Sequence, residues 1–322
     1  MASESIQVGV LLPTREAVMS GRFETAPLLA MAERVEAAGY ASIWVGDSLL
    51  ARPRFEPLTL LAAVAARTRR CLLGTAVLLP ALRHPLVLAH AAATVDRLAE
   101  GRLVLGVGIA PDSNAVRREF ENAGVPFAQR VGRLVESLVV CRQLWANGGA
   151  RGVTFQGRYW NLADARLLPT PQRAGGPPIW MGGEVAPATE RAGRLAEGWM
   201  PNSVTPAAWA EGWQRVLATA RVERGGAAQL TPALYTTLNV GRDARIAAAE
   251  LRTFVEGYYA APYETIARLQ GFHAGDAASC VERLQGFVAV GVRHIVLRFG
   301  GGDQIEQLER TMREILPRLR IS

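Results

Sequence analysis

Residues 72–110 constrain the fold of this 322-residue chain more than any other segment. An apolar run from Leu72 to Leu79 precedes a loop that contains Arg83-His84-Pro85. A segment with apolar residues at helical spacing follows and ends at Gly101, and a second apolar run then extends from Leu103 to Val107. This order of strand, loop, helix, turn and strand predicts a parallel βαβ unit. Both strands are apolar throughout, which is typical of a sheet covered by helices.

The same alternation repeats from end to end. Further strands are predicted at residues 6–12, 42–46, 178–182, 198–201, 233–240 and 293–299, and further helices at 27–38, 56–68, 131–146, 187–195, 206–224, 244–257, 279–290 and 303–316. Eight strands, each followed by a helix, predict a (β/α)8 barrel, although an open doubly wound sheet has a similar rhythm. Since no interdomain linker is visible, we expect a single barrel domain over residues 1–322.

Three segments interrupt the rhythm, at residues 111–130, 148–176 and 257–276. The second contains a segment at 154–160 that is predicted to form a small hairpin. Long loops in a compact domain are usually functional or mobile, and the loops that follow barrel strands lie at the catalytic face.

Several of these segments together resemble the flavin-dependent, bacterial luciferase-like monooxygenase superfamily. The matching pieces are Leu73-Gly74-Thr75-Ala76-Val77, Arg83-His84-Pro85, Asp96-Arg97-Leu98, Gly101-Arg102-Leu103 and Leu105-Gly106-Val107-Gly108, with Ile43-Trp44-Val45-Gly46-Asp47, Pro178-Ile179-Trp180-Met181-Gly182-Gly183 and Leu316-Pro317-Arg318-Leu319 outside them. The resemblance covers nearly the whole chain. It implies a TIM barrel of the luciferase-like type with loop insertions at its C-terminal face, and a flavin at its mouth.

Composition excludes several kinds of chemistry. All 36 basic residues are arginine, which rules out Schiff-base lysines and a Walker A lysine and leaves arginine, backbone N–H groups or hydroxyls to hold a phosphate. The arginines are scattered, so we expect no nucleic-acid partner despite the net charge of +7. The three cysteines and four histidines show no metal-ligand spacing, and no metal is expected.

Hydropathy and the first residues lead to an expectation about location. The longest apolar stretches fall short of the ~18 residues that span a bilayer. Residues 1–5 carry no basic or apolar targeting pattern. We therefore expect a soluble cytoplasmic protein that has no membrane partner.

Cofactor contacts are expected at several strand ends. Gly106 and Gly108 mark a tight exit from a strand, and Pro111 at the third glycine position excludes a Rossmann fingerprint. The resemblance puts the flavin edge near this turn and implies a non-proline cis peptide at Ala76-Val77. Gly182-Gly183-Glu184 before a helix is either a phosphate cradle or an ordinary turn, and the resemblance favours the cradle.

Two arginines are candidate phosphate ligands. Arg130 stands at the start of a long helix, where the related family has an arginine, and it is favoured over Arg133. Arg298 ends the last strand, where barrel phosphate sites are common, although an ion pair with a nearby carboxylate is an equal alternative.

The reactive side chains depart from the family pattern. Many relatives have Asp-His where this chain has Asp47-Ser48, and relatives that use the deazaflavin coenzyme often have a glutamate near the place of Pro111 or Asp112. Asp47 and Ser48 are the candidate catalytic residues, with a plain turn-capping role as the alternative for Ser48. Substrate contacts are expected from the aromatic side chains of Trp44, Phe55, Tyr258 and Tyr259. They are also expected from His273, for which a solvated loop histidine is the favoured alternative.

The resemblance implies a two-component monooxygenase that uses O2 and reduced FMN, supplied by a separate flavin reductase, to oxidise an apolar organic substrate. The alternative is an oxidoreductase that transfers hydride with the deazaflavin coenzyme F420, whose acidic tail would suit the basic chain. A flavin-binding protein without catalysis is the second alternative. Helices 56–68 and 86–99 look too apolar for full exposure, so a homodimer is expected.

Overall fold

The computed structural model describes residues 6–147, 149–225 and 230–320. The chain divides into two compact units, which are described separately. Unit 1 comprises Met1–Glu16, Glu24–Trp44 and Trp180–Ser322, and unit 2 comprises Ala17–Phe23 and Val45–Ile179. The expectation of a single domain stays a prediction. The expectations for residues 1–5 and 148 lie outside the described residues.

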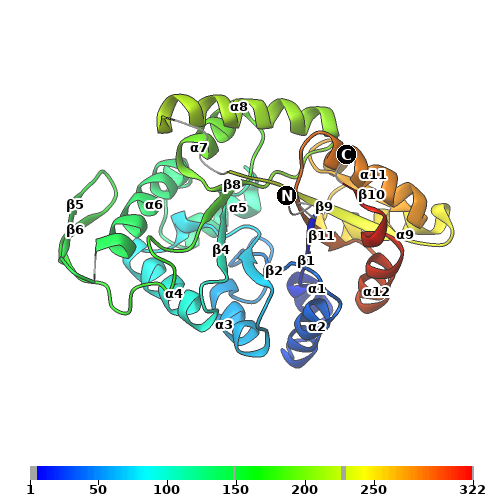
Figure 1. Ribbon diagram of the computed structural model, residues 1–322, viewed down its shortest axis with the longest axis horizontal. Helices are drawn as coiled ribbons and strands as arrows, with labels where there is room; N and C mark the ends of the chain where they lie inside the picture. Colours follow the sequence, from blue (N-terminus) through cyan, green and yellow to red (C-terminus); the bar gives the residue numbers. More distant parts are fainter. Residues whose placement is uncertain (1–5, 148, 226–229, 321–322) are drawn as a thin grey trace. The chain divides into compact units, whose positions relative to one another are not determined.

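Parallel strands form the centre of unit 1, and most of its sequence alternates between strand and helix (Figure 1). β11 (His294–Phe299) lies between β1 (Gln7–Leu11) and β9 (Thr231–Val240), and both pairings are parallel. β8 (Gly198–Trp199) joins β7 (Ile179–Met181) to the start of β9. The helices are α1 (Thr14–Met19), α2 (Ala26–Ala37), α7 (Ala186–Leu195), α8 (Pro206–Arg224), α9 (Ala244–Tyr259), α10 (Tyr263–Ala267), α11 (Ala277–Ala289) and α12 (Gln304–Glu314).

Unit 2 is built on β3 (Leu72–Thr75) and β4 (Leu103–Val107), which also pair in parallel. Its helices are α3 (Pro57–Arg67), α4 (Pro85–Leu98), α5 (Asn114–Asn122) and α6 (Arg130–Asn147). An antiparallel hairpin of β5 (Val153–Gln156) and β6 (Asn161–Ala165) follows α6. The α4–α6 contact is buried, and the Trp145 indole nitrogen donates there to the Ala89 carbonyl at 3.0 Å.

The hydrogen-bonded order of the strands closes into a ring. It runs β9-β11-β1-β2-β3-β4-β7-β8, with β2 at Ser42–Val45, and β8 pairs again with β9. The predicted (β/α)8 barrel is therefore confirmed. β10 (Phe272–Gly275) extends the sheet beyond the ring because it pairs with the last residues of β9.

The element boundaries agree with the expected rhythm except in a few segments. The sequence predicts no regular element for four segments of the structure, namely helices α1, α5 and α10 and strand β10. β3 ends at Thr75 rather than Leu79, and a cis peptide joins Ala76 to Val77 directly after it. The Leu78 N–H then donates to the Gly106 carbonyl, so the chain stays next to β4 although regular pairing has ended.

The apolar helices that suggested a dimer differ in exposure. Among the described residues of α3, no large apolar side chain is exposed, whereas α4 exposes Val87 and Leu98. The homodimer stays a prediction, which now rests on α4 alone. Over the described ranges, no helix combines the length and apolar character needed to cross a membrane.

The turn of the β5–β6 hairpin depends on one carboxylate of α6. Glu136 accepts hydrogen bonds from the backbone N–H groups of Arg158, Tyr159 and Trp160, at 3.0, 2.8 and 2.7 Å. The Trp160 indole also donates to Ser137 at 3.0 Å. Glu136 thus takes the place of the backbone carbonyls that would satisfy these N–H groups in a longer hairpin.

We predict that Glu136→Ala lowers the free energy of unfolding by about 1–3 kcal/mol, because it removes the acceptor of three backbone donors, two of which are partly buried. Urea unfolding measures the loss, and limited proteolysis at residues 157–160 shows whether it is local. The matched control is Glu121→Ala, which changes an exposed glutamate on α5. Equal stability of the two variants would refute the anchoring role.

Candidate functional site

Asp47 follows β2 in unit 2 and is tied into a buried ion pair. Its carboxylate accepts from both terminal nitrogens of Arg83, at 2.6 and 3.1 Å, and from the Leu79 N–H at 2.9 Å. Arg83 also contacts Glu56 at 3.1 Å. Burial alone would lower the pKa of Arg83, but the two carboxylates outweigh it and raise the pKa. Asp47 therefore fixes the loop after β3, and its oxygens already carry three hydrogen bonds.

Ser48 is also committed to neighbouring groups. Its hydroxyl donates to Glu119 of α5 at 2.7 Å and accepts from the Arg52 N–H at 2.9 Å. The same Glu119 oxygen accepts from the N–H groups of Leu50 and Ala51, so it organises the whole turn. Ser48 is buried, and a hydrogen bond from it to a reactive oxygen would require the bond to Glu119 to break. The geometry matches the turn-capping alternative.

The ends of β3 and β4 lie side by side in unit 2 and carry small residues. The cis peptide between Ala76 and Val77 is present, as the resemblance implies. A Cβ atom added at Gly108 would lie 2.6 Å from a Val77 methyl group, so only glycine fits beside it. The Thr75 hydroxyl donates to the Gly106 carbonyl at 2.7 Å and fixes the relation of the two strands. These residues could present backbone and small side chains to a flat ring.

Arg130 begins α6, at the start of the long helix as expected. Its guanidinium stacks on Phe127 with the carbon 3.8 Å from the ring centre, and its Nη1 donates to the Phe127 carbonyl at 3.2 Å. Arg117 stacks on the same ring at 4.7 Å. The Nε of Arg130 is buried and has no hydrogen-bond partner, so this guanidinium has capacity for an anion. Its role as a phosphate ligand stays a prediction.

In unit 1, the turn after β7 has the features of an anion cradle. Gly183 has a φ of +97°, which side chains rarely adopt, and a Cβ there would lie 2.9 Å from Ala188. The Gly183 carbonyl is turned away toward the Trp199 indole, which donates to it at 2.9 Å. No side chain caps the N-terminus of α7 at Val185. The turn therefore leaves backbone N–H groups at a helix start, where an anion is favoured.

Glu184 in this turn is held by neighbouring side chains of unit 1. Burial raises the pKa of its carboxyl, although the hydrogen bond from Ser203 and the charge of Arg215 act in the opposite direction. Arg215 of α8 also donates to the Glu184 carbonyl at 3.4 Å. The carboxyl is thus engaged by Ser203, and its contribution to the cradle is confined to the backbone.

A buried aromatic cluster lies in unit 1 around His294, the first residue of β11. Trp44 contacts Trp180 at 5.2 Å between ring centres, and His294 packs edge-on against both. The Trp44 indole donates to Ser42 at 2.7 Å, and Ser42 bonds to His294 at 2.8 Å. Trp44 therefore points back along β2, away from its C-terminal end, and is fully buried. Its expected role in substrate binding is not supported by this position.

Arg298 occupies the other end of β11. It is 2% exposed, its Nε donates to Thr237 at 3.0 Å and its Nη1 to the Tyr259 hydroxyl at 3.1 Å. The expected aromatic residues surround it, with the Tyr258 and Tyr259 ring centres 4.4 and 5.4 Å from the guanidinium carbon. No carboxylate of the described residues lies within ion-pair distance, so the alternative of an ion pair is not observed.

His273 and Phe55 are the remaining residues expected to contact a substrate. His273 is on β10 and bonds to Ser279 at 2.7 Å, and burial is the main cause that lowers its pKa. Phe55 lies half-buried before α3 in unit 2. Residues missed by sequence reasoning are Glu119, which organises the Ser48 turn, and Tyr235, which alternation along β9 places on the same face as Thr237.

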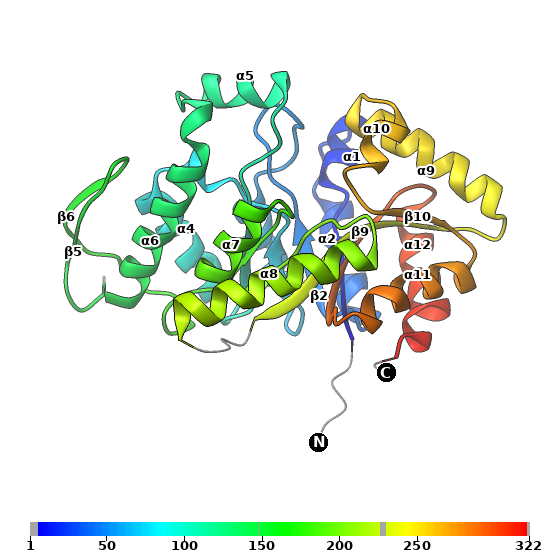
Figure 2. The same ribbon diagram turned by 90° about the horizontal axis from the view of Figure 1, so that it is seen from above.

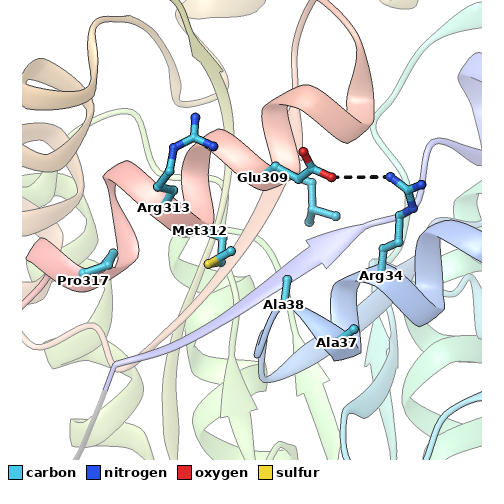
Figure 3. A pocket seen from close by; sticks show the side chains of 8 residues that line it. Arg34, Ala37, Ala38, Glu309, Met312, Arg313 and Pro317 are labelled. Carbon is cyan, nitrogen blue, oxygen red and sulfur yellow. Dashed lines mark hydrogen bonds and ion pairs between the residues drawn. The ribbon is translucent and has the colours of Figure 1, made fainter.

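A cavity of about 460 Å³ does not involve any expected site residue. Figure 3 shows the side chains that line it. It lies between α2 and α12, with Ala37, Ala38 and Met312 in its wall and the Arg34–Glu309 ion pair at its edge. The wall includes the C-terminal ends of both helices, and these return toward the N-terminal ends of the strands. This is the stability face of a barrel rather than its catalytic face. Among the described residues, no cluster of His, Cys, Asp or Glu could hold a metal ion.

The comparisons with known proteins cover almost the entire chain. Residues 6–279 match the family model of luciferase-like monooxygenases. An F420-dependent glucose-6-phosphate dehydrogenase of Beutenbergia cavernae is 32% identical, over 93% of this chain and 95% of the relative.

Two solved structures show the same fold. An F420-dependent secondary alcohol dehydrogenase in complex with an F420-acetone adduct has a TM-score of 0.84 and 20% identity, covering 98% of this chain and 99% of its own. The monooxygenase RslO1 from Streptomyces bottropensis has a TM-score of 0.75 and 23% identity, covering 98% of each chain.

We predict that Ser48→Ala lowers the free energy of unfolding by about 1–3 kcal/mol and leaves cofactor affinity unchanged, because the hydroxyl serves Glu119 and Arg52. Urea unfolding and cofactor titration measure the two effects. Ser20→Ala is the control, since it removes an exposed hydroxyl whose bonds to Ala17 and Arg22 are local. A stable Ser48→Ala variant with weakened cofactor binding would contradict the structural role.

His294 provides a pH-dependent prediction. Burial lowers its pKa from 6.5 to about 4, so the unfolded chain takes up a proton before the folded chain does. The neutral His294 contributes its full stability above pH 6.5, the pKa of the unfolded chain. This contribution is lost as the pH falls through 4, the pKa of the folded chain, and the total loss approaches about 3 kcal/mol. Urea unfolding from pH 7 to 4 should show a shallower decline for His294→Gln than for the exposed-site control His90→Gln. Parallel curves would disprove the assignment.

Proposed function

This chain belongs to the luciferase-like monooxygenase family and is an oxidoreductase of that class. We propose that it transfers hydride between an organic substrate and the deazaflavin coenzyme F420. The observation that carries the choice of coenzyme is the relative that matches nearly the full length of the chain, which is named for F420. This supports the alternative of the sequence analysis better than its first expectation, a monooxygenase with reduced FMN. The relatives named above are all enzymes, which argues against a binding protein without catalysis.

The residues present fit a phosphate-bearing flavin or deazaflavin. Gly182-Gly183 and the uncapped start of α7 would hold the phosphate, in a place where a side chain at Gly183 would collide with Ala188. In unit 2, Arg130 has an unpartnered Nε, and Gly108 with the Ala76-Val77 peptide offers a bare surface for a ring. No lysine is needed for any of these contacts.

A bound deazaflavin supplies a carbon that accepts or donates a hydride, and the chain's own residues position the substrate and handle protons. Asp47 accepts hydrogen bonds from Arg83 and the Leu79 N–H, so it orients the loop after β3. Ser48 donates to Glu119. Neither residue is available as the acid or base in this arrangement.

Tyr235 is the side chain best suited to hold a proton near a substrate oxygen. It pairs with Val296 in the parallel register and shares the face of His294 and Arg298, which is the barrel interior. Its hydroxyl makes no hydrogen bond to another described residue, and burial raises its pKa, so it stays protonated. We assign it the donation of a hydrogen bond to the substrate oxygen that gains or loses the proton.

Purified protein titrated separately with F420 and FMN tests this function. We expect tighter binding of F420, and reduction of bound F420 by a secondary alcohol without O2 uptake. Gly183→Val should weaken F420 binding at least tenfold, while Gly291→Val, another positive-φ glycine without a close neighbour, should not. Binding of FMN alone, with O2 consumption when it is reduced, would overturn the proposal.

A further inference from the structure

We infer that the substrate of this chain carries a carboxylate and that Arg298 binds it through Nη2. The inference rests on the proposed function because it concerns the substrate of that site. It goes beyond that function by naming a charged group that the substrate must have. All residues that carry it belong to unit 1.

The parallel register places Arg298 inside the barrel at its catalytic end. His294 pairs with Ala233, and Arg298 pairs with Thr237. Side chains two or four residues apart on a strand share a face, so Arg298 lies on the interior face that His294 defines by its contact with Trp44 and Trp180. It is near the C-terminal end of β11, where barrel enzymes bind substrates.

The guanidinium is buried with one nitrogen unused. Nε and Nη1 donate to Thr237 and Tyr259, but Nη2 is buried and has no hydrogen-bond partner. An arginine side chain cannot lose its proton in a protein. A buried charge with neither a counter-ion nor a complete set of acceptors is strongly unfavourable, and it persists where a ligand supplies the missing acceptor.

The surroundings hold the guanidinium rigidly in one orientation. Tyr258 and Phe254 pack against it, with ring centres 4.4 and 5.3 Å from its carbon. The Tyr259 hydroxyl that accepts from Nη1 itself donates to Gln270 at 2.6 Å, and Asn202 donates to the same Gln270 oxygen at 3.1 Å. Because this network fixes Nε and Nη1, the open donor of Nη2 is preorganised for an incoming oxygen.

The charged residues near Arg298 favour a substrate with one negative charge. The Tyr258 ring that contacts Arg298 also stacks with Arg15, whose guanidinium carbon lies 4.8 Å from the ring centre. Glu16 is the carboxylate whose charge reaches Arg298. Arg15, Glu16 and Arg298 together carry a net charge of +1, which the single charge of a carboxylate balances.

Arg298 and the cofactor cradle cannot hold the same phosphate group. The cradle follows β7, and the strand order β7-β8-β9-β11 puts two strands between them. With strands about 4.8 Å apart, the two sites are separated by roughly 14 Å around the ring. If the cradle holds the coenzyme phosphate, Arg298 remains for the substrate.

Binding of small acids and their amides tests the inference. Lactate and mandelate, each compared with its uncharged amide and with inorganic phosphate, are titrated into the protein by calorimetry, with and without F420. We expect each carboxylate to bind at least tenfold more tightly than its amide, a difference that Arg298→Gln abolishes. Arg298→Lys should retain part of it, and Arg293→Gln, at the start of the same strand, should retain all of it.

Equal binding of acid and amide to the wild type, or an unchanged preference in a folded Arg298→Gln variant, would overturn the inference. So would phosphate that binds more tightly than the carboxylates through Arg298. If Arg298→Gln does not fold, the wild-type comparison and Arg298→Lys still decide. F420 titration of the same samples separates the two proposals: loss of F420 binding with an intact carboxylate preference refutes only the coenzyme, and the reverse refutes only the inference.

Discussion

Parallel register is the constraint on which the rest of this structure depends. A parallel strand pair puts residues of the same register on the same face, and ring closure makes one of those faces a closed interior. In unit 1, this places His294, Val296 and Arg298 on one line along β11. His294 ends in an aromatic core and Arg298 ends among tyrosines, although the two side chains are only four residues apart. The packed core around His294 and the candidate binding residue Arg298 therefore lie at opposite ends of β11, within the same barrel interior.

Much of the fold could be predicted from the sequence, because the strands are apolar and glycine or proline marks the helix ends. β4 and α8 have the expected bounds. The missed elements lack such signals. α5 is polar along most of its length and is held by its Ser113 cap, while α10 is a short helix. β10 pairs with β9 through its backbone, which sequence periodicity does not report.

The candidate site was predictable in its positions but not in its partners. Glycine turns and strand ends identified Gly183, Gly108 and Arg298, since backbone geometry at these places depends on local sequence. The partners come from distant segments: Glu119 is 71 residues from Ser48, and Tyr259 is 39 residues before Arg298. Spacing along the chain cannot show such contacts. For that reason, sequence reasoning did not show that Asp47 and Ser48 are hydrogen-bonded to neighbouring residues, and their catalytic role stays a prediction.

The bond between Ser48 and Glu119 also limits the substitutions that can succeed at this turn. Glu119 is almost fully buried, and one of its oxygens gathers a hydroxyl and two backbone N–H groups. A histidine at position 48, which the family resemblance leads us to expect, would have to occupy the place of a hydroxyl that Glu119 accepts from. The two positions are thus coupled, and a histidine at position 48 should require a change at residue 119 as well. The identity of residue 48 therefore depends on the α5 segment that carries Glu119.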